Sequence, residues 1–207
     1  MRPFQPPPLT AQIKAKLETI QAWLPEARTP LYLEIGCGVG LHPILMSQKN
    51  PSSHLLAFER TRSKFEKALG RWQNHGQPTN LFLCHGDAHF YTHHLFGDHT
   101  QRYVNGIFIF YPNPYPKLKQ SNLRLAQMPF FYDLASILKP DGFIQITSNI
   151  KSYLDEIVDH VQKKPVWSLK SLQKIAPGSS PRTHFEKKYL ARGEPCYELI
   201  LQPSRAL

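Results

Sequence analysis

The chain has few cysteines and no long apolar run. Its three cysteines, Cys37, Cys84 and Cys196, are scattered and odd in number, which argues against a disulfide framework, and no CxxC pair indicates zinc. No stretch of about 18 apolar residues is available to span a bilayer. The opening MRPFQPPPLT also lacks the apolar core of a signal peptide. We therefore expect a protein of the reducing cytoplasm with no membrane segment.

Acidic residues are outnumbered by basic ones. The 207 residues include 25 Lys and Arg against 15 Asp and Glu, which gives a formal net charge of +10. Such an excess favours a polyanionic partner, because each neutralised phosphate releases condensed counterions. We expect a nucleic acid, with a merely soluble basic protein as the alternative. The length and a hydrophobic fraction of 41% fit one globular α/β domain.

Short apolar runs alternate with segments of helical spacing. Thr10 is placed to cap a first helix that ends before Pro30. Strand-like runs follow at 31–36, 54–59, 81–84, 106–110 and 142–148. Helical patterns lie at 41–49, 60–76, 123–138 and 153–161, and Pro129 either kinks the third of these or lies in its first turn. The runs at 166–172 and 196–201 are candidates to pair with each other. This alternation favours a mostly parallel sheet covered by helices on both faces.

The strongest local motif is a glycine-rich loop after the first strand, Glu34-Ile-Gly36-Cys-Gly38-Val-Gly40. Closely spaced glycines let backbone amides approach a ligand without interference from a Cβ atom. The dinucleotide fingerprint needs a further glycine where Leu41 stands, and no Gly-Lys-Ser/Thr follows to make a phosphate-binding P-loop. The motif therefore predicts a site for a nucleoside ligand that carries no pyrophosphate.

Three acids follow three successive strands and suit S-adenosylmethionine, which has a cationic sulfonium and amino group. Glu34 is placed to favour that cationic end, and Glu59 to accept hydrogen bonds from both ribose hydroxyls. Asp87 and Ala88 are expected at the adenine amino group. Each acid alone is also typical of an ordinary turn or cap, but their ordered recurrence predicts a site for this methyl donor.

A stiff loop, Phe110-Tyr-Pro-Asn-Pro-Tyr-Pro-Lys117, follows the fourth strand. Ligands of open α/β sheets bind at such strand ends. We expect Asn113 to read a base edge, with Tyr111 and Tyr115 stacking on a base. The expected phosphate contacts are Lys117, Lys119 and Arg124. The alternative is a rigid surface loop that leads into a solvated helix.

These motifs, together with Arg182-Thr183-His184-Phe185-Glu186, resemble the bacterial tRNA (guanine-N7-)-methyltransferase family over about residues 31–201. The resemblance implies an α/β, Rossmann-like class I methyltransferase with a mostly parallel seven-stranded sheet and S-adenosylmethionine as cofactor. It implies methylation of guanine N7 in the variable region of tRNA. Residues 1–30 would form a proline-rich arm and helix, ahead of a single methyltransferase domain at 31–207. The oligomeric state, monomer or homodimer, is left open.

The resemblance also carries site residues. Thr183, Phe185 and Glu186 retain the family's T-x-F/Y-E motif, which places them on the substrate side. The alternative for Glu186 is a capping acid at the start of a helix. The family's two aspartates are replaced by Asn113 and Asn149, which would occupy the catalytic positions.

The two asparagines leave alternatives open. N7 of guanine carries a lone pair and no proton, so transfer requires placement rather than a general base. Activity at N7 is therefore compatible with Asn113 and Asn149. A different substrate, an amino group of a base or protein, is the second hypothesis, because Asn113-Pro-Tyr weakly resembles an N-P-P-Y loop. A catalytically weak homologue that binds donor or RNA is the third.

The crowded histidines and Cys37 predict no further site. The histidines of the segment 85–99 are crowded, but Gly86 interrupts any helix that would align His85, His89 and His93 as metal ligands. His94 and His99 belong to the same segment. Solvent-facing or RNA-facing histidines are expected there, with no metal. Cys37 has no histidine base nearby in sequence and is not expected to be a nucleophile.

Overall fold

The computed structural model describes residues 8–26, 28–97, 103–164 and 166–204. The chain divides into two compact units, Met1–Tyr103 and Val104–Leu207. Most of the expected proline-rich arm, residues 1–7, lies outside the described part. None of the helices in the described ranges has both the length and the apolarity that crossing a membrane requires.

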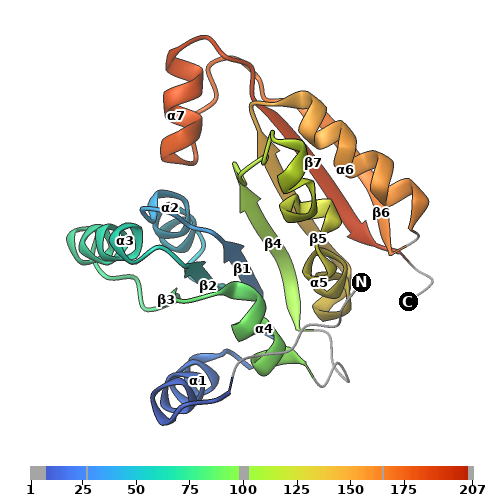
Figure 1. Cartoon of the computed structure of the whole chain (residues 1–207). Helices are drawn as coiled ribbons and strands as arrows, with labels where there is room; N and C mark the ends of the chain where they lie inside the picture. The colour runs from blue at the N-terminus through green and yellow to red at the C-terminus, as the bar shows by residue number, and fades with distance from the viewer. Residues whose placement is uncertain (1–7, 27, 98–102, 165, 205–207) are drawn as a thin grey trace. The chain divides into compact units, whose positions relative to one another are not determined.

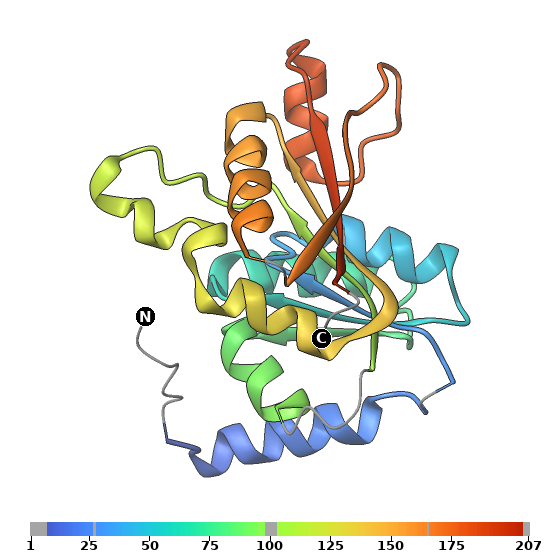
Figure 2. The same cartoon turned by 90° about the vertical axis from the view of Figure 1, so that its right-hand side faces the viewer.

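The first unit is a parallel three-stranded sheet with helices on both faces. Its elements are α1 (Ala11–Trp23), β1 (Leu31–Ile35), α2 (Leu41–Lys49), β2 (His54–Glu59), α3 (Arg62–Asn74), β3 (Leu81–His85) and α4 (Ala88–Phe96). β2 pairs in parallel with β1 on one side and β3 on the other. Helices α1 and α4 lie together on one face, and α2 and α3 on the other (Figures 1 and 2). A strand buried on both faces has a continuous apolar sequence, which explains HLLAFE in β2.

The second unit holds the remaining strands. Its elements are β4 (Val104–Phe110), the 3-10 helices η1 (Leu118–Leu123) and η2 (Leu125–Gln127), α5 (Pro129–Ile137), β5 (Leu138–Ser148), α6 (Lys151–Lys163), β6 (Trp167–Lys174), α7 (His184–Ala191) and β7 (Tyr197–Pro203). β4 and β5 are parallel, while β7 runs antiparallel to both β5 and β6. Helix α6 lies along β6 on one face of this sheet (Figures 1 and 2).

The described strands belong to a mostly parallel seven-stranded sheet, which confirms the predicted fold class. Each strand-like run is a strand, and the two late runs pair as expected. The helix predicted over 123–138 is wrong in extent. Pro129 cannot continue a helix, since it lacks an N–H, and it holds Met128 extended at φ −84° and ψ 132°. The chain therefore crosses two 3-10 turns before α5 begins at Pro129, and Leu138 already opens β5.

Candidate functional site

The glycine-rich loop adopts a conformation that favours glycine at three positions. Gly36, Gly38 and Gly40 have φ of +78°, +59° and +77°, in the left-handed region that residues with a Cβ rarely adopt. A Cβ on Gly40 would also lie 2.9 Å from the Cβ of Ala68 on α3. The amides of Gly36 and Cys37 both donate to the carbonyl of Phe58, at 2.9 Å. The loop is thus wrapped around the carboxyl end of β2.

Glu59 ends β2 and holds this loop by its side chain. Its carboxylate accepts hydrogen bonds from the amide of Gly38 at 2.9 Å and from the amide of Thr61 at 2.6 Å. The residue is 6% exposed. A buried carboxylate fixed by two backbone amides is pre-oriented beside the loop. This arrangement fits the predicted contact with ribose hydroxyls, which stays a prediction.

Glu34 has a partner that the sequence did not reveal. Its Oε2 lies 2.7 Å from Nδ1 of His42, in the first turn of α2, and both residues are buried. The carboxylate predicted to favour a cationic ligand is therefore paired inside the protein. His42 lies eight positions after Glu34 in the sequence, and the glycine-rich motif did not point to it.

Asp87 and Ala88 lie where β3 gives way to α4. Oδ1 of Asp87 accepts a hydrogen bond from the amide of His89 at 2.9 Å, so Asp87 is the N-cap of α4. Its Oδ2 lies 4.0 Å from Nη1 of Arg60 in an exposed pair. Nearby, Nζ of Lys16 donates to the carbonyl of His85 at 2.8 Å. The cap that was the alternative for Asp87 is present, and the adenine contact stays a prediction.

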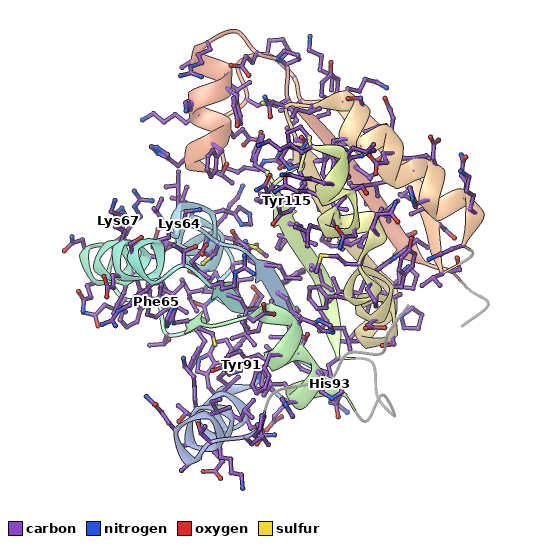
Figure 3. All side chains as sticks on the ribbon, viewed as in Figure 1. Lys64, Phe65, Lys67, Tyr91, His93 and Tyr115 are labelled. Carbon is purple, nitrogen blue, oxygen red and sulfur yellow. The ribbon has the colours of Figure 1, made fainter. Side chains whose placement is uncertain are left out.

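The crowded histidines are split between two elements. His85 ends β3, whereas His89, His93 and His94 lie on α4, as Figure 3 shows for His93. These histidines therefore do not share one helical face. His99 lies outside the described residues. Across those residues, no group of three or more His, Cys, Asp or Glu side chains is placed to hold a metal ion.

Cys37 lies within the glycine-rich loop and is buried. Burial, followed by the nearby carboxylates of Glu34 and Glu59, raises the pKa of the Cys37 thiol well above its usual value. A thiol that stays protonated is a poor nucleophile. The environment of Cys37 therefore gives no support to covalent chemistry at this residue.

In the second unit, the loop after β4 has two residues with positive φ and an internal side-chain hydrogen bond. Tyr111 and Tyr115 have positive φ, +52° and +46°, which is uncommon for residues with a Cβ. Oδ1 of Asn113 accepts a hydrogen bond from the amide of Tyr115 at 3.1 Å, which is a typical Asx turn. Asn113 is exposed, and so are Lys117 and Lys119 beyond it. Figure 3 labels Tyr115 in this loop.

Arg124, a predicted phosphate contact, braces the loop instead of extending into solvent. Its Nε donates to the carbonyl of Tyr115 at 3.2 Å, and its Nη1 lies 2.7 Å from Oε2 of Glu156 on α6. The Arg124 side chain is 22% exposed. Its charge is therefore largely committed to Glu156.

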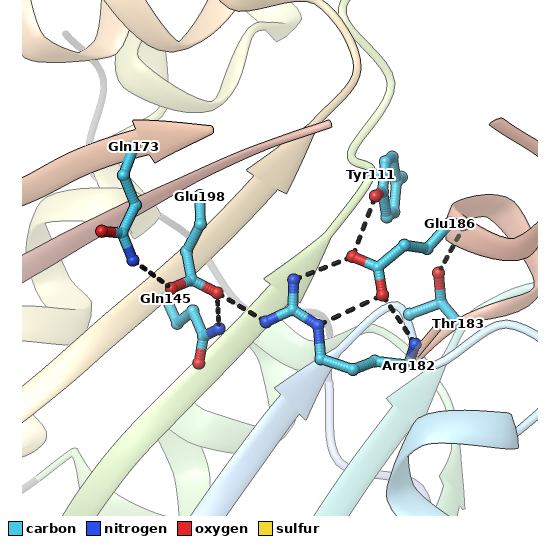
Figure 4. Close-up of polar contacts among 7 residues, drawn as sticks. All are labelled: Tyr111, Gln145, Gln173, Arg182, Thr183, Glu186 and Glu198. Carbon is cyan, nitrogen blue, oxygen red and sulfur yellow. Dashed lines mark hydrogen bonds and ion pairs between the residues drawn. The ribbon is translucent and has the colours of Figure 1, made fainter. Parts of the chain in front are cut away.

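Glu186 lies in the first turn of α7 and accepts hydrogen bonds from two directions (Figure 4). The phenol of Tyr111 donates to Oε1 at 3.1 Å, and Nη2 of Arg182 donates to the same oxygen at 2.8 Å. The amide of Arg182 donates to Oε2 at 2.6 Å. Burial alone would raise the pKa of Glu186, but the hydrogen bonds from Arg182 outweigh it and lower that pKa. Glu186 is thus an ionised bridge between Tyr111 and Arg182.

Arg182 connects this carboxylate to a second one (Figure 4). Its Nη1 lies 2.5 Å from Oε2 of Glu198 on β7, and Glu198 also accepts a hydrogen bond from Gln145 on β5. The guanidinium carbon lies 5.2 Å from the ring centroid of Phe110. Arg182 pairs with both Glu186 and Glu198, so these three charges sum to −1. The sequence pointed to neither Arg182 nor Glu198 as a site residue.

Thr183 and Phe185 occupy the start of α7. Oγ1 of Thr183 accepts from the amide of Glu186 at 3.0 Å and caps the helix. Phe185 is 42% exposed, and its ring centroid lies 6.4 Å from that of Tyr111. Tyr111 also lies 5.4 Å from the ring of Tyr189. One face of α7 is therefore aromatic and is joined to the loop after β4.

Asn149 follows the last residue of β5. Its Nδ2 donates to Oε2 of Glu194 at 3.0 Å. Asn149 thus contacts a carboxylate to which no sequence motif pointed. Asn149, Tyr111 and Glu186 all lie in the second unit, while the predicted donor residues all lie in the first.

The fold is that of class I methyltransferases. A 16S rRNA methyltransferase, KamB, shares the fold with a TM-score of 0.64 at 15% identity, over 96% of this chain and 95% of that one. The B. subtilis M1A22 tRNA methyltransferase TrmK shares it with a TM-score of 0.53 at 13% identity, over 91% of this chain and 65% of that one.

The sequence relatives define the family. The Methyltransf_4 family, described as "Putative methyltransferase", matches residues 28–199, and the chain belongs to it. The tRNA (guanine-N(7)-)-methyltransferase of Nitrosomonas eutropha is 30% identical over 83% of this chain and 75% of its own length. That of Nitrosospira multiformis is 28% identical over 84% and 74%. These matches confirm the family resemblance.

Proposed function

We propose that this protein transfers the methyl group of S-adenosylmethionine to N7 of a guanine in tRNA. The observation that carries the proposal is the loop Gly36–Gly40 held by the buried carboxylate of Glu59, in a chain of this methyltransferase family. The relatives from Nitrosomonas eutropha and Nitrosospira multiformis are named for this reaction. The net charge of +10 supports a nucleic-acid substrate.

In this proposal the first unit holds the donor. The glycines of the loop let its backbone lie close against the donor, and Glu59 accepts hydrogen bonds from the ribose of the donor. Asp87 and Ala88 lie at the adenine end. When bound, S-adenosylmethionine supplies an electrophilic methyl group on a sulfonium. The buried carboxylate of Glu59 lies beside the loop, and its negative charge favours a cationic ligand over a nucleotide phosphate.

The second unit holds the base. The loop after β4 carries Asn113 at an Asx turn, where its side-chain nitrogen is available for a base edge. N7 attacks without losing a proton, so the protein acts by placing the base in line with the methyl group. Thr183 and Glu186 act by fixing α7 against Tyr111, and Phe185 offers an exposed ring for stacking.

The direct test is mass spectrometry of nucleosides from an unmodified tRNA transcript incubated with protein and methyl-labelled donor. We expect label in 7-methylguanosine, and none when the transcript carries 7-deazaguanosine at the target. Label in methyladenosine or on protein would assign the chain to a different substrate. An absence of label in the presence of bound donor would mean a binding protein without transfer.

A second expectation concerns the exposed lysines of the substrate loop. Replacing Lys117 and Lys119 by Gln removes up to two interactions with phosphates, so the log–log slope of tRNA affinity against salt becomes shallower by about 0.7 to 0.9 for each phosphate no longer neutralised. Lys170 and Lys174 on β6, also exposed, provide the control pair. Filter binding over a salt series measures the slope, and an unchanged slope in the loop variant contradicts the assignment.

A further inference from the structure

The contact between Asn149 and Glu194 lies at the edge of the sheet from which the substrate loop emerges. The amide of Tyr111 donates to the carbonyl of Thr147 at 2.9 Å, which joins the start of the loop to the end of β5. Ser148, the last residue of β5, pairs with Tyr197, the first residue of β7. The end of β4, the end of β5 and the approach to β7 therefore meet at one place. Glu194 lies on that approach.

Glu194 is fixed but not enclosed. Its Oε2 is held by Nδ2 of Asn149 at 3.0 Å, and its Oε1 lies 3.8 Å from Nη1 of Arg192. The side chain of Arg192 is 58% exposed and that of Glu194 is 36% exposed, so this ion pair is screened by solvent. One edge of the carboxylate is oriented by Asn149, while part of it stays open to a ligand.

Negative charge near the base favours the reaction. As the C–N7 bond forms and the S–C bond breaks, the electron pair stays on sulfur and the positive charge moves from the sulfonium to the guanine ring. A carboxylate placed beforehand near the base stabilises that charge as it develops. The segments that follow β4 and β5, residues 111–117 and 149–150, contain no acid. Glu186 is already committed to Arg182 and Tyr111.

We propose that Glu194 supplies the carboxylate of the base site and that Asn149 orients it. Asn149 stands where the resembled family has an aspartate, and in this proposal Glu194, from the segment before β7, contributes a carboxylate at the same place. This inference rests on the proposed function. It assigns Glu194 to direct contact with the substrate and Asn149 to a positioning role.

The test is a double-mutant cycle of Glu194→Gln, Asn149→Asp and the double variant, with kcat and KM measured on tRNA at saturating donor. Glu194→Gln should lower kcat about tenfold to a hundredfold, with KM for tRNA changed less than about threefold. Asn149→Asp places two carboxylates against each other and should also lower kcat. The double variant restores one carboxylate held by one amide and should return kcat to within about fivefold of the wild type.

The matched control is Asp155→Asn on α6, an exposed acid 2.7 Å from Lys151, which should leave kcat unchanged. A Glu194→Gln variant as active as the wild type overturns the inference and leaves the proposed function standing. A double variant no more active than its worse parent overturns it as well, even if both parents are slow or unstable. A wild type that yields no 7-methylguanosine overturns the proposed function, and the inference with it.

Discussion

Replacement of Glu59 by Gln should lower the affinity for S-adenosylmethionine by about a hundredfold. The carboxylate accepts hydrogen bonds from the amides of Gly38 and Thr61, and it is the predicted acceptor for the ribose hydroxyls. A hydrogen bond to a charged group contributes about 1.5–3 kcal/mol, so loss of the charge removes roughly tenfold to a hundredfold for each ribose contact. A loosened glycine loop adds to the loss.

Glu66→Gln is the matched control for this variant. Glu66 lies on α3 in an exposed pair with Arg62 at 2.8 Å, and such pairs contribute little. Donor affinity of this control should stay within about twofold of the wild type. Calorimetric titration compares the two variants at one pH. Equal donor affinity of Glu59→Gln and the wild type would remove Glu59 from the donor site.

Replacement of Arg182 by Met should lower the free energy of unfolding by about 3–5 kcal/mol. The substitution leaves Glu186 and Glu198 without the cation that both of them contact, and uncompensated buried charge is the most damaging result of breaking an ion pair. Glu186 is 2% exposed, so water cannot replace the guanidinium. The phenol of Tyr111 would lose a fixed acceptor, and tRNA methylation should fall as well.

The pH dependence of this variant has a definite sign. The pKa of Glu186 is lowered in the folded protein, because the Arg182 hydrogen bonds outweigh burial. The stability that the ionised Glu186 adds to the wild type is fully present above its unfolded pKa of about 4.3, and it is lost as pH falls through its pKa in the folded protein. Without Arg182, burial raises the pKa of Glu186, so Glu186 becomes protonated as pH falls and its buried charge no longer destabilises the variant. The difference in free energy of unfolding between the wild type and the variant should therefore narrow between pH 8 and pH 5.

Chemical denaturation at several pH values measures both effects. Arg62→Met is the control, since the Arg62 side chain is 82% exposed and its pair with Glu66 is on the surface. Its free energy of unfolding should change by less than about 0.5 kcal/mol at every pH. An Arg182→Met variant as stable as this control would show that the buried charges are satisfied in another way.

The conformation of the glycine-rich loop could be predicted from the sequence because its signals are local, while donor binding there stays a prediction. Glycines with positive φ and an acid at a strand end form a pattern within a few residues of sequence. The structure has Gly36, Gly38 and Gly40 in left-handed conformations, as that pattern predicts. The predicted start of the helix near residue 123 was wrong, because the spacing of apolar residues does not show that the helix can begin only at Pro129.

The polar partners on the substrate side could not be predicted in the same way. Arg182 contacts Glu198, 16 residues away, and Asn149 contacts Glu194, 45 residues away. Such contacts depend on which strand ends meet at one edge of the sheet, and no short motif encodes that. A motif therefore pointed to Glu186 without revealing that its carboxylate is already paired with Arg182.

The most direct test of the account is titration of the wild-type protein with S-adenosylmethionine by calorimetry, followed by a crystal structure of the complex. One donor per chain is expected, with the ribose on the carboxylate of Glu59 and the backbone of Gly36–Gly40 against the ligand. A protein that shows no heat of binding with the donor, or a complex with the donor away from Glu59, would contradict it.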